Sequence, residues 1–372
     1  MKLLHTADLH LGKILHNINL LEDQRHALGQ ILEMVQREQT DCVLISGDVY
    51  QNSVPSAEAQ ELFSTFLEQL VALHQQVFVI SGNHDSGTRI RYLSPLVRQV
   101  GIHLAQRFQG TLQPIELRDE FGPITFHLLP FVRLRKIRTF YPEESLQTLE
   151  DGIRTVLAHS PMNPNQRNVL LCHQTVFGAI PCESEEQIIG TVEAVHATLF
   201  EGFDYVAMGH IHIPQNAGKA TIRYAGTPLP YSFSEIKTEK NVTIVELGEK
   251  GQTEIRTLPI LPLHPMEEKT GSFEEMLSAP SSENYLALYL TDRALPFDAG
   301  HQLRQHYPNL MKSIVIGRNS LGEEISLEPE MENKSLTDLY QDFCKLQGFN
   351  EPTEEELLLL EELLKKHGEE SL

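Results

Sequence analysis

Five short polar clusters in the first 212 residues constrain this chain more than any other feature of its sequence. Each cluster closes a short apolar run that is typical of a β-strand. Because the carboxyl ends of parallel strands meet at one edge of a sheet, a parallel sheet would bring all five clusters together. The clusters are Asp8-x-His10, Gly47-Asp48, Gly82-Asn83-His84-Asp85, Cys172-His173 and Gly209-His210-Ile211-His212.

The residue types in these clusters are typical of a site for two divalent metal ions. Carboxylate oxygens, the carbonyl oxygen of Asn83 and neutral imidazole nitrogens form a mixed shell, which suits Mn²⁺, Fe²⁺ or Zn²⁺ better than Ca²⁺. Two such ions lie roughly 3.5–4 Å apart and need a shared ligand, for which Asp48 is our candidate. One D-x-H pair would be a weak signal, but five clusters at predicted strand ends favour a metal site over a purely structural role.

The series D-x-H, G-D, G-N-H-D, H and G-H-x-H resembles the motifs of the calcineurin-like metallophosphoesterases. Longer segments resemble those of one branch of that family, the SbcD nuclease subunits, and this resemblance covers nearly the whole chain. The segments that carry this closer likeness are LLHTADLHLG (3–12), SGDVYQNSVPS (46–56), SGNHDS (81–86), LLPFVR (128–133) and YAGTPLPYSFSE (224–235).

The resemblance implies a set of ligands for each of the two ions, with Mn²⁺ as the expected metal. The first ion would be held by Asp8, His10, Asp48 and His212. The second ion would be held by Asp48, Asn83, His173 and His210.

The resemblance also implies the reaction, which is in-line attack by hydroxide on a DNA phosphodiester. His84 would stabilise the transition state and protonate the departing 3′ oxygen, so it would be the general acid. Some archaeal relatives have a second active-site histidine three residues after the bridging aspartate. This chain has Gln51 there, so an auxiliary role at that position is not carried over.

The apolar pattern predicts an α/β protein. Helical patterns alternate with apolar runs in the first third, and later runs suit a second, more mixed sheet. We therefore expect the four-layer α/β/β/α sandwich of the calcineurin-like family. The expected helices are 20–38, 56–73 and 88–99, and the expected strands of the first sheet include 42–46, 77–81 and 102–104. The expected strands of the second sheet are 124–130, 168–174, 204–210, 221–227 and 241–247.

We expect the chain to have three parts. A metallophosphoesterase nuclease domain would span 1–258, and the proline-rich segment LPILPLHPM (258–266) would mark its end. A small α/β unit at 259–330 would, by resemblance, cap the site and help to select DNA ends. The apolar spacing at 331–372 predicts a helix-loop-helix. By resemblance it would bind the base of the coiled coil in an SbcC-type, SMC-like ATPase, and docking on its own globular domain is the alternative.

With a net charge of −21, the chain lacks the excess of basic residues that usually marks nucleic-acid binding. The acidity is unevenly spread, because residues 321–372 hold 15 acidic residues against 4 lysines. A basic cluster follows the LLPFVR segment, and both contact with phosphate and a solvated loop face stay open for it. The cluster comprises Arg133, Arg135, Lys136 and Arg138.

By resemblance, the protein is expected to be the nuclease subunit of an ATP-driven SbcCD-type complex in DNA repair, replication and recombination. It would degrade double-stranded DNA ends as a 3′-to-5′ exonuclease and open hairpin DNA. A homodimer within a heterotetramer is implied, through helices near 56–73 and 88–99. No apolar run reaches the roughly 18 residues of a membrane span, so we expect a cytoplasmic protein with no membrane partner.

Two other classes of protein compete with this interpretation. A small-molecule or phosphoprotein phosphoesterase with the same metal site fits the acidic balance, but it leaves the capping unit and the helix-loop-helix unexplained. A non-catalytic scaffold would use the tail to bind an ATPase and keep a vestigial site. The presence of every expected ligand disfavours the scaffold.

Overall fold

The computed structural model describes residues 1–92, 94–105, 108–185 and 194–316, together with 325–326, Pro352 and Leu357. The predicted helix-loop-helix at 331–372 lies outside the described residues apart from those last two positions. The chain divides into two compact units. Unit 1 comprises Met1–Glu268, Ser282–Ala287 and Tyr307–Met311, and unit 2 comprises Lys269–Ser281, Leu288–His306 and the chain from Lys312 onward.

Unit 1 contains two six-stranded sheets. The first has the strand order β16-β15-β1-β4-β5-β6. Its parallel strands are β1 (Lys2–Thr6), β4 (Cys42–Ser46), β5 (Gln76–Ile80) and β6 (Ile102–Leu104). The strands β15 (Asn241–Leu247) and β16 (Thr253–Pro259) extend it in antiparallel fashion.

The position of β15 corrects the sequence prediction, which placed 241–247 in the second sheet. In the structure β15 pairs with β1, and Leu3 lies opposite Val245. An apolar run shows that a segment is a strand but carries no information about its partner, because pairing depends on where the chain returns in space.

The second sheet has the order β13-β14-β12-β9-β8-β7 and is mixed, as expected. Its four central strands are parallel, and its two edge strands are antiparallel. The strands are β7 (Ile115–Asp119), β8 (Gly122–Leu129), β9 (Arg167–His173), β12 (Tyr205–Gly209), β13 (Gln215–Ala217) and β14 (Lys219–Tyr224).

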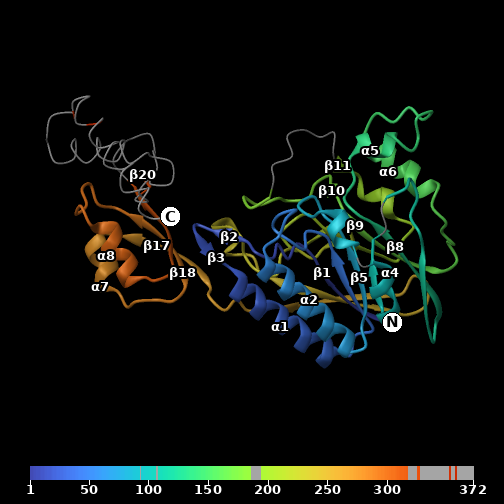
Figure 1. Ribbon diagram of the computed structural model, residues 1–372, viewed down its shortest axis with the longest axis horizontal. Helices are drawn as coiled ribbons and strands as arrows, with labels where there is room; N and C mark the ends of the chain where they lie inside the picture. Colours follow the sequence, from blue (N-terminus) through green and yellow to red (C-terminus); the bar gives the residue numbers. More distant parts are fainter. Residues whose placement is uncertain are drawn as a thin grey trace. The chain divides into compact units, whose positions relative to one another are not determined.

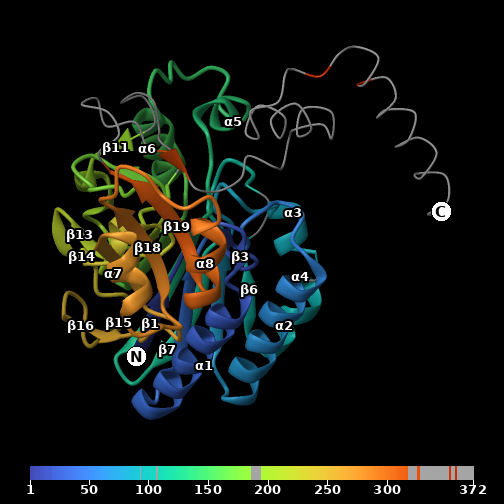
Figure 2. The same ribbon diagram turned by 90° about the vertical axis from the view of Figure 1, so that its left-hand side faces the viewer.

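Helices cover the outer face of each sheet. On the first sheet, α1 (Leu21–Glu38) and α2 (Ala57–Ala72) lie side by side, as Figures 1 and 2 show in blue. On the second sheet, α5 (Leu134–Arg138) and α6 (Leu149–Ala158) share one apolar cluster with its strands. A third cluster lies between the sheets and includes Phe78 of one and Phe126 of the other, whose rings stack with centroids 4.2 Å apart. The four-layer α/β/β/α sandwich is therefore confirmed.

Caps and apolar spacing account for where these helices form. The side chain of Ser56 accepts the Ala59 N–H at 3.2 Å and caps α2, and Thr148 begins α6 with a capping box. In α1, Ala27, Ile31 and Val35 recur every four residues and are buried, so one face packs on the sheet.

The predicted helix at 88–99 is not continuous. It is replaced by α3 (Gly87–Ile90), α4 (Ser94–Val97) and the 3₁₀ helix η1 (Arg98–Val100). Pro95 explains the restart at α4, because proline is tolerated in the first turn of a helix but not in its interior.

Smaller elements complete unit 1. They are β2 (Ile14–Leu15), β3 (Ile18–Asn19), β10 (Thr175–Val176), β11 (Ala194–Val195), η3 (Ala197–Phe200) and η4 (Phe233–Glu235). Among the described residues, no helix is both long enough and apolar enough to cross a membrane.

The C-terminal part contains a four-stranded sheet of order β17-β18-β19-β20. The division between the two units runs through β17 (Met266–Gly271), β18 (Tyr285–Leu290) and β19 (Leu310–Val315), and β20 (Ile325–Ser326) belongs to unit 2. Unit 2 also contains α7 (Phe273–Ser278) and α8 (Ala299–His306), which contact each other. That residues 259–330 form a small α/β capping domain stays a prediction.

Candidate metal centre

The five polar clusters meet at the carboxyl ends of strands from both sheets, rather than from one sheet as the sequence suggested. The first sheet supplies Asp8 after β1, Asp48 after β4 and Asn83 after β5. The second sheet supplies His173 at the end of β9 and His210 just after β12. Because the sheets are stacked face to face, their carboxyl ends form a common edge, which a sequence pattern alone cannot distinguish from the edge of one sheet.

The backbone at this edge is strained. Asp8, His10, Asp48 and His210 have φ values of 52°, 44°, 47° and 99°, a region that residues other than glycine rarely adopt. The Asp8 N–H donates to Gly47 O at 3.0 Å, and the His10 N–H donates to Asp48 O at 2.9 Å, so the loops after β1 and β4 hold each other. Strain of this kind concentrates at functional sites.

Two glycines give these loops room for the polar side chains. A Cβ atom on Gly47, which has a φ of +93°, would overlap the imidazole of His173. A Cβ atom on Gly82 would overlap the carboxylate of Asp48. Only glycine fits at either position without displacing a predicted ligand.

On one side of the centre, the side chains of Asp8, His10 and His212 come together. One ligand atom from each lies within 4.8 Å of the others, and all three residues are buried. The Nε2 atoms of His10 and His212 face each other at 3.1 Å. The Asp8 carboxylate accepts the backbone N–H of His210, with its two oxygens at 2.9 and 3.1 Å. We refer to this group as the His212 side.

On the other side, Asp48, His173 and His210 form a second group, again with ligand atoms within 4.8 Å. His173 Nδ1 donates to Ser46 O at 2.7 Å, so its Nε2 faces Asp48 Oδ2 at 3.3 Å and Asn83 Oδ1 at 3.1 Å. His210 Nδ1 lies 3.0 Å from the same Asn83 oxygen. We refer to this group as the His173 side.

The electrostatics of the centre favour a positive charge between these atoms. Burial raises the pKa of Asp8 well above its usual range. Burial also opposes ionisation of Asp48, but His173 outweighs it and holds the pKa of Asp48 below its usual range. In turn, Asp48 and Asp8 overcome the burial of His173 and raise its pKa to about 9. The two carboxylates therefore favour a positive charge at His173, whose Nε2 lies 3.3 Å from Asp48 Oδ2.

The other imidazoles of the centre are in the neutral form that binds metals. Burial lowers the pKa of His10 and of His210 to about 3 and lowers that of His212 well below its usual value. Buried imidazole nitrogens, a carbonyl oxygen and carboxylates are a donor set that fits divalent transition-metal ions. The residues present therefore fit the metals that the sequence predicts, while their assignment as ligands stays a prediction.

His84 differs from these residues in exposure and in contacts. Its backbone N–H donates to Asp48 Oδ1 at 2.9 Å, and its Nδ1 donates to Gln51 O at 3.0 Å. The ring lies edge-on to His10 with centroids 4.8 Å apart, and His84 is half-buried where the seven predicted ligands are mostly buried. A ring nitrogen of His84 lies near enough to Asp48 and His10 to bind a metal ion together with them. The exposure of His84, however, suits contact with a substrate.

Asp85 holds the loop after β5 in place, a role that the sequence did not identify. Its carboxylate accepts the backbone N–H groups of Val49, Tyr50 and Gly82 at 3.0 to 3.1 Å. Burial raises its pKa to about 6. The fourth letter of G-N-H-D was the available signal for this contact.

A chain of buried and half-buried polar groups supports the His212 side. His212 Nδ1 lies 2.6 Å from Ser184 Oγ, which donates to Glu235 Oε1 at 2.7 Å. Glu235 forms a buried ion pair with Lys240, whose Nζ also donates to His212 O at 2.9 Å and to Thr227 Oγ1 at 2.8 Å. Partners of this kind fix the ring and tautomer of a metal-binding histidine. The YAGTPLPYSFSE likeness pointed to the segment that contains Glu235 but not to its contacts.

Gln24 supports the loop that carries Asp8 and His10. From α1, its side-chain NH₂ donates to His10 O at 2.8 Å and to Tyr231 Oη at 3.0 Å, and its Oε1 accepts the Gly12 N–H at 2.9 Å. Both Gln24 and Tyr231 are buried. A single glutamine in an amphipathic helix gives no sequence signal for such a role.

Comparison with known proteins places this geometry in a family. Residues 1–214 match the calcineurin-like phosphoesterase family model. The chain is 34% identical to the SbcD subunit of the SbcCD nuclease of Staphylococcus saprophyticus, with 84% of each chain covered. The chain belongs to this family, as the resemblance in the sequence predicted. As an SbcD-type calcineurin-like phosphoesterase, it is a metal-dependent hydrolase.

Two further comparisons involve a second relative and a solved structure. The chain is 30% identical to the SbcD subunit of the SbcCD nuclease of Staphylococcus epidermidis, over 92% of this chain and 93% of that protein. Among solved structures, a dimetal phosphatase from Danio rerio matches 70% of this chain and 97% of its own at 12% identity, with a TM-score of 0.39.

Proposed function

We propose that this protein is the nuclease subunit of an ATP-driven complex with an SbcC-type, SMC-like ATPase, and that it hydrolyses DNA phosphodiesters with two Mn²⁺ ions. The observation that carries the proposal is the meeting of seven predicted ligand side chains at one edge, in a chain similar to the SbcD subunits of two SbcCD nucleases. The seven are Asp8, His10, Asp48, Asn83, His173, His210 and His212.

In this proposal the His212 side holds one ion and the His173 side holds the other, with Asp48 shared between them. Asn83 Oδ1 would complete the second set, since it already lies 3.0 to 3.1 Å from nitrogens of His173 and His210. When bound, the ions would lower the pKa of the attacking water and neutralise charge on the phosphoryl oxygens.

His84 would act as the general acid that protonates the departing 3′ oxygen. The Gln51 carbonyl fixes the proton of Nδ1 and orients the ring, so Nε2 is the atom left to carry a proton to the leaving group. The neighbouring ring of His10 supports this orientation.

The finer assignment extends the same proposal. The complex would act as an ATP-dependent 3′-to-5′ exonuclease on double-stranded DNA and as a hairpin-opening endonuclease, in repair, replication and recombination in the cytoplasm. Residues 259–330 would cap the site, and 331–372 would bind the ATPase. Exposed apolar residues of the α3–η1 segment, namely Tyr92, Leu96 and Val100, support a homodimer contact on that surface.

The test compares wild type with His84→Ala in cleavage of end-labelled duplex and hairpin DNA with Mn²⁺, alone and with the ATPase subunit and ATP. We expect His84→Ala to keep its metal content and to lose DNA cleavage by about 10²-fold or more, since general acids contribute roughly that factor. His26→Ala, an exposed histidine on α1, is the matched control.

Hydrolysis of bis-nitrophenyl phosphate separates the outcomes, because its leaving group needs little protonation. If wild type hydrolyses only this small ester, even with partner and ATP, the protein is a small-molecule phosphoesterase and the DNA assignment is wrong. If His84→Ala cuts DNA as wild type does, the acid role is wrong.

A further inference from the structure

A groove of about 640 Å³ lies beside the metal centre within unit 1. The loop after β5 contributes Gly82 and Asn83 to its lining, so the lining includes a predicted metal ligand. The segment that follows β8 contributes residues 130–133 to the same lining. Four cations reach this lining, and they are Arg91, Arg133, Arg135 and Lys136.

Few carboxylates lie near the cations of the groove to balance their positive charge. Arg133, Arg135 and Lys136 are exposed, and Arg91 is half-buried. Within the described residues, none of the four has a carboxylate within ion-pair distance, whereas exposed cations elsewhere, such as Lys219 beside Glu201, do. The acidic residue of the lining, Asp85, directs its carboxylate to three backbone N–H groups. In a chain of charge −21, this groove is a local concentration of unpaired positive charge.

An aromatic ring connects the cations to the metal centre. The centroid of Phe131 lies 6.2 Å from the ring of His173 and 6.3 Å from that of His210. The guanidinium of Arg133 lies 5.8 Å from the same centroid, in a cation–π contact. The Phe131 N–H donates to Ser81 O at 2.9 Å, which fixes this segment to the end of β5. The Phe131 ring therefore links Arg133 to two predicted ligands, His173 and His210.

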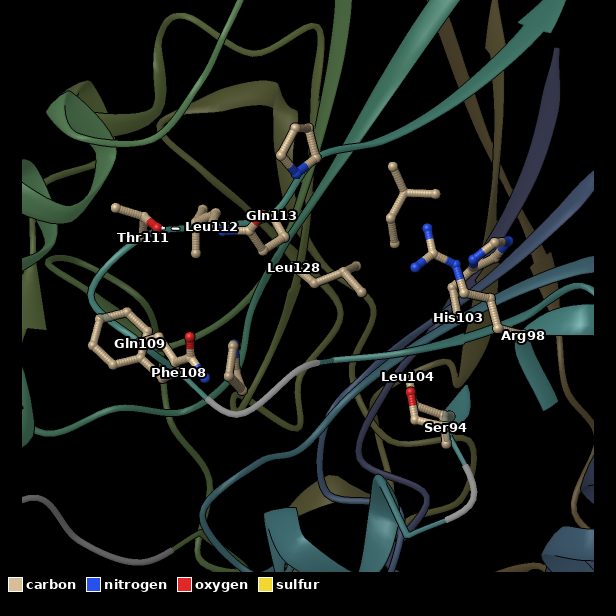
Figure 3. A pocket seen from close by; sticks show the side chains of 13 residues that line it. Ser94, Arg98, His103, Leu104, Phe108, Gln109, Thr111, Leu112, Gln113 and Leu128 are labelled. Carbon is tan, nitrogen blue, oxygen red and sulfur yellow. Dashed lines mark hydrogen bonds between the residues drawn. The ribbon is translucent and has the colours of Figure 1, made fainter. Parts of the chain in front are cut away.

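A neighbouring cavity has a different lining. It measures about 360 Å³, shares Phe108 and Pro130 with the groove, and is lined by 13 residues, among them Arg98 and His103. Figure 3 shows these two side chains together at one end, with apolar and amide side chains around the rest. Its single strong cation and its mixed polarity favour no particular ligand.

We infer that the groove binds the phosphodiester backbone of the DNA strand next to the scissile phosphate. This inference rests on the proposed function and adds the residues that position the strand. Arginine and lysine contacts to phosphate are independent of sequence and set register and orientation. A strand whose scissile phosphate lies at the metal centre would place its adjoining phosphates beside Arg133 first, and then beside Arg135 and Lys136.

The test replaces three cations of the groove together, in Arg133→Gln/Arg135→Gln/Lys136→Gln. The control replaces three exposed cations that each pair with a carboxylate elsewhere in unit 1, in Arg37→Gln/Arg118→Gln/Lys219→Gln. Both variants lose the same charge, so a nonspecific effect of net charge would be equal in the two. Full-length protein, alone and with the ATPase subunit, is measured for binding and cleavage of a labelled DNA duplex with a single-stranded end.

We expect the groove variant to raise the KM for DNA by about tenfold at 0.1 M salt, with the control within about twofold of wild type. The slope of log affinity against log salt should fall in magnitude by about two to three, or close to one per lost phosphate contact. Turnover of bis-nitrophenyl phosphate should be unchanged in both variants, because that ester is too small to reach along the groove.

The outcomes distinguish this inference from the proposed function. If wild type cleaves DNA and the groove variant matches the control in KM and salt slope, the groove does not bind the strand. The inference is also wrong if the groove variant loses turnover of the small ester equally, since the three residues would then act on the metal centre. If wild type hydrolyses the small ester but not DNA under any condition, the proposed function itself fails.

Discussion

The two sides of the metal centre are built from the same residue types but are held in different ways. On the His173 side, the imidazole Nδ1–H donates to a backbone carbonyl, that of Ser46. On the His212 side, Nδ1 contacts the Ser184 side chain, which depends in turn on Glu235. The main chain thus fixes His173. Side chains, which a mutation can remove, fix His212. A point mutation can therefore change metal affinity on the His212 side without touching a ligand.

The largest effect is expected at Asp48, where the two sides meet. Asp48→Asn should lose both ions and reduce turnover of bis-nitrophenyl phosphate by about 10³-fold, because it removes the charge that both ions share. Metal content by elemental analysis and turnover measure the two effects. In contrast, His10→Gln and His210→Gln should each lower the occupancy of one ion. Retention of both ions in Asp48→Asn would show that the two sides do not share this ligand.

A substitution at Gly47 should disturb the His173 side next most strongly. Gly47→Ala should destabilise the fold by roughly 3 kcal/mol, since the new Cβ overlaps His173 and the positive φ is strained as well. Urea unfolding with chelator measures the change.

Gly178 provides the matched control for Gly47. Its φ is +85° and a Cβ atom there would meet nothing within 4 Å. Gly178→Ala should therefore cost only the strain, roughly 1–2 kcal/mol. Equal losses in the two variants would mean that His173 yields to the methyl group and that the His173 side is less rigid than its backbone contact suggests.

The smallest effect is expected at Ser184 and tests the side-chain support of the His212 side. Ser184→Ala should weaken binding of one ion by about tenfold, as loss of a histidine's outer partner typically does, and Ser184→Thr should restore it. Calorimetric titration with Mn²⁺ measures the affinity directly. Ser232→Ala is the control, because Ser232 donates to the same Glu235 oxygen at 2.9 Å. A loss of affinity as large in Ser232→Ala would assign the effect to Glu235 rather than to the contact with His212.

The strands that carry the centre could be predicted because each polar cluster follows a continuous apolar run. The bounds of β4 coincide with the predicted run at 42–46, and those of β5, β9 and β12 differ from the predicted runs by one residue at each end. The sheet to which each run belongs was predicted correctly except for 241–247, which pairs with β1 of the first sheet. Strand period reports burial of a side chain, and both sheets bury their strands in the same manner.

The supporting residues were beyond the reach of sequence patterns for a related reason. Ser184 and His212 are 28 residues apart, and Ser184 and Glu235 are 51 apart, so no periodicity links them. Lys240 would read as a solvated charge, yet it is buried against Glu235. Such contacts depend on how loops from different strands close over one another.

The place of β15 between β1 and β16 also affects how the chain is made. β1 lies inside the first sheet, yet one of its two neighbours is a strand that begins at Asn241. Until the ribosome has released that segment, one edge of β1 has no partner, and unpaired edges invite aggregation. More than half of the sequence is therefore synthesised while β1, which leads to Asp8, still has one open edge. Only the late pairing of β15 closes that edge, so chaperones would act on the chain before this step.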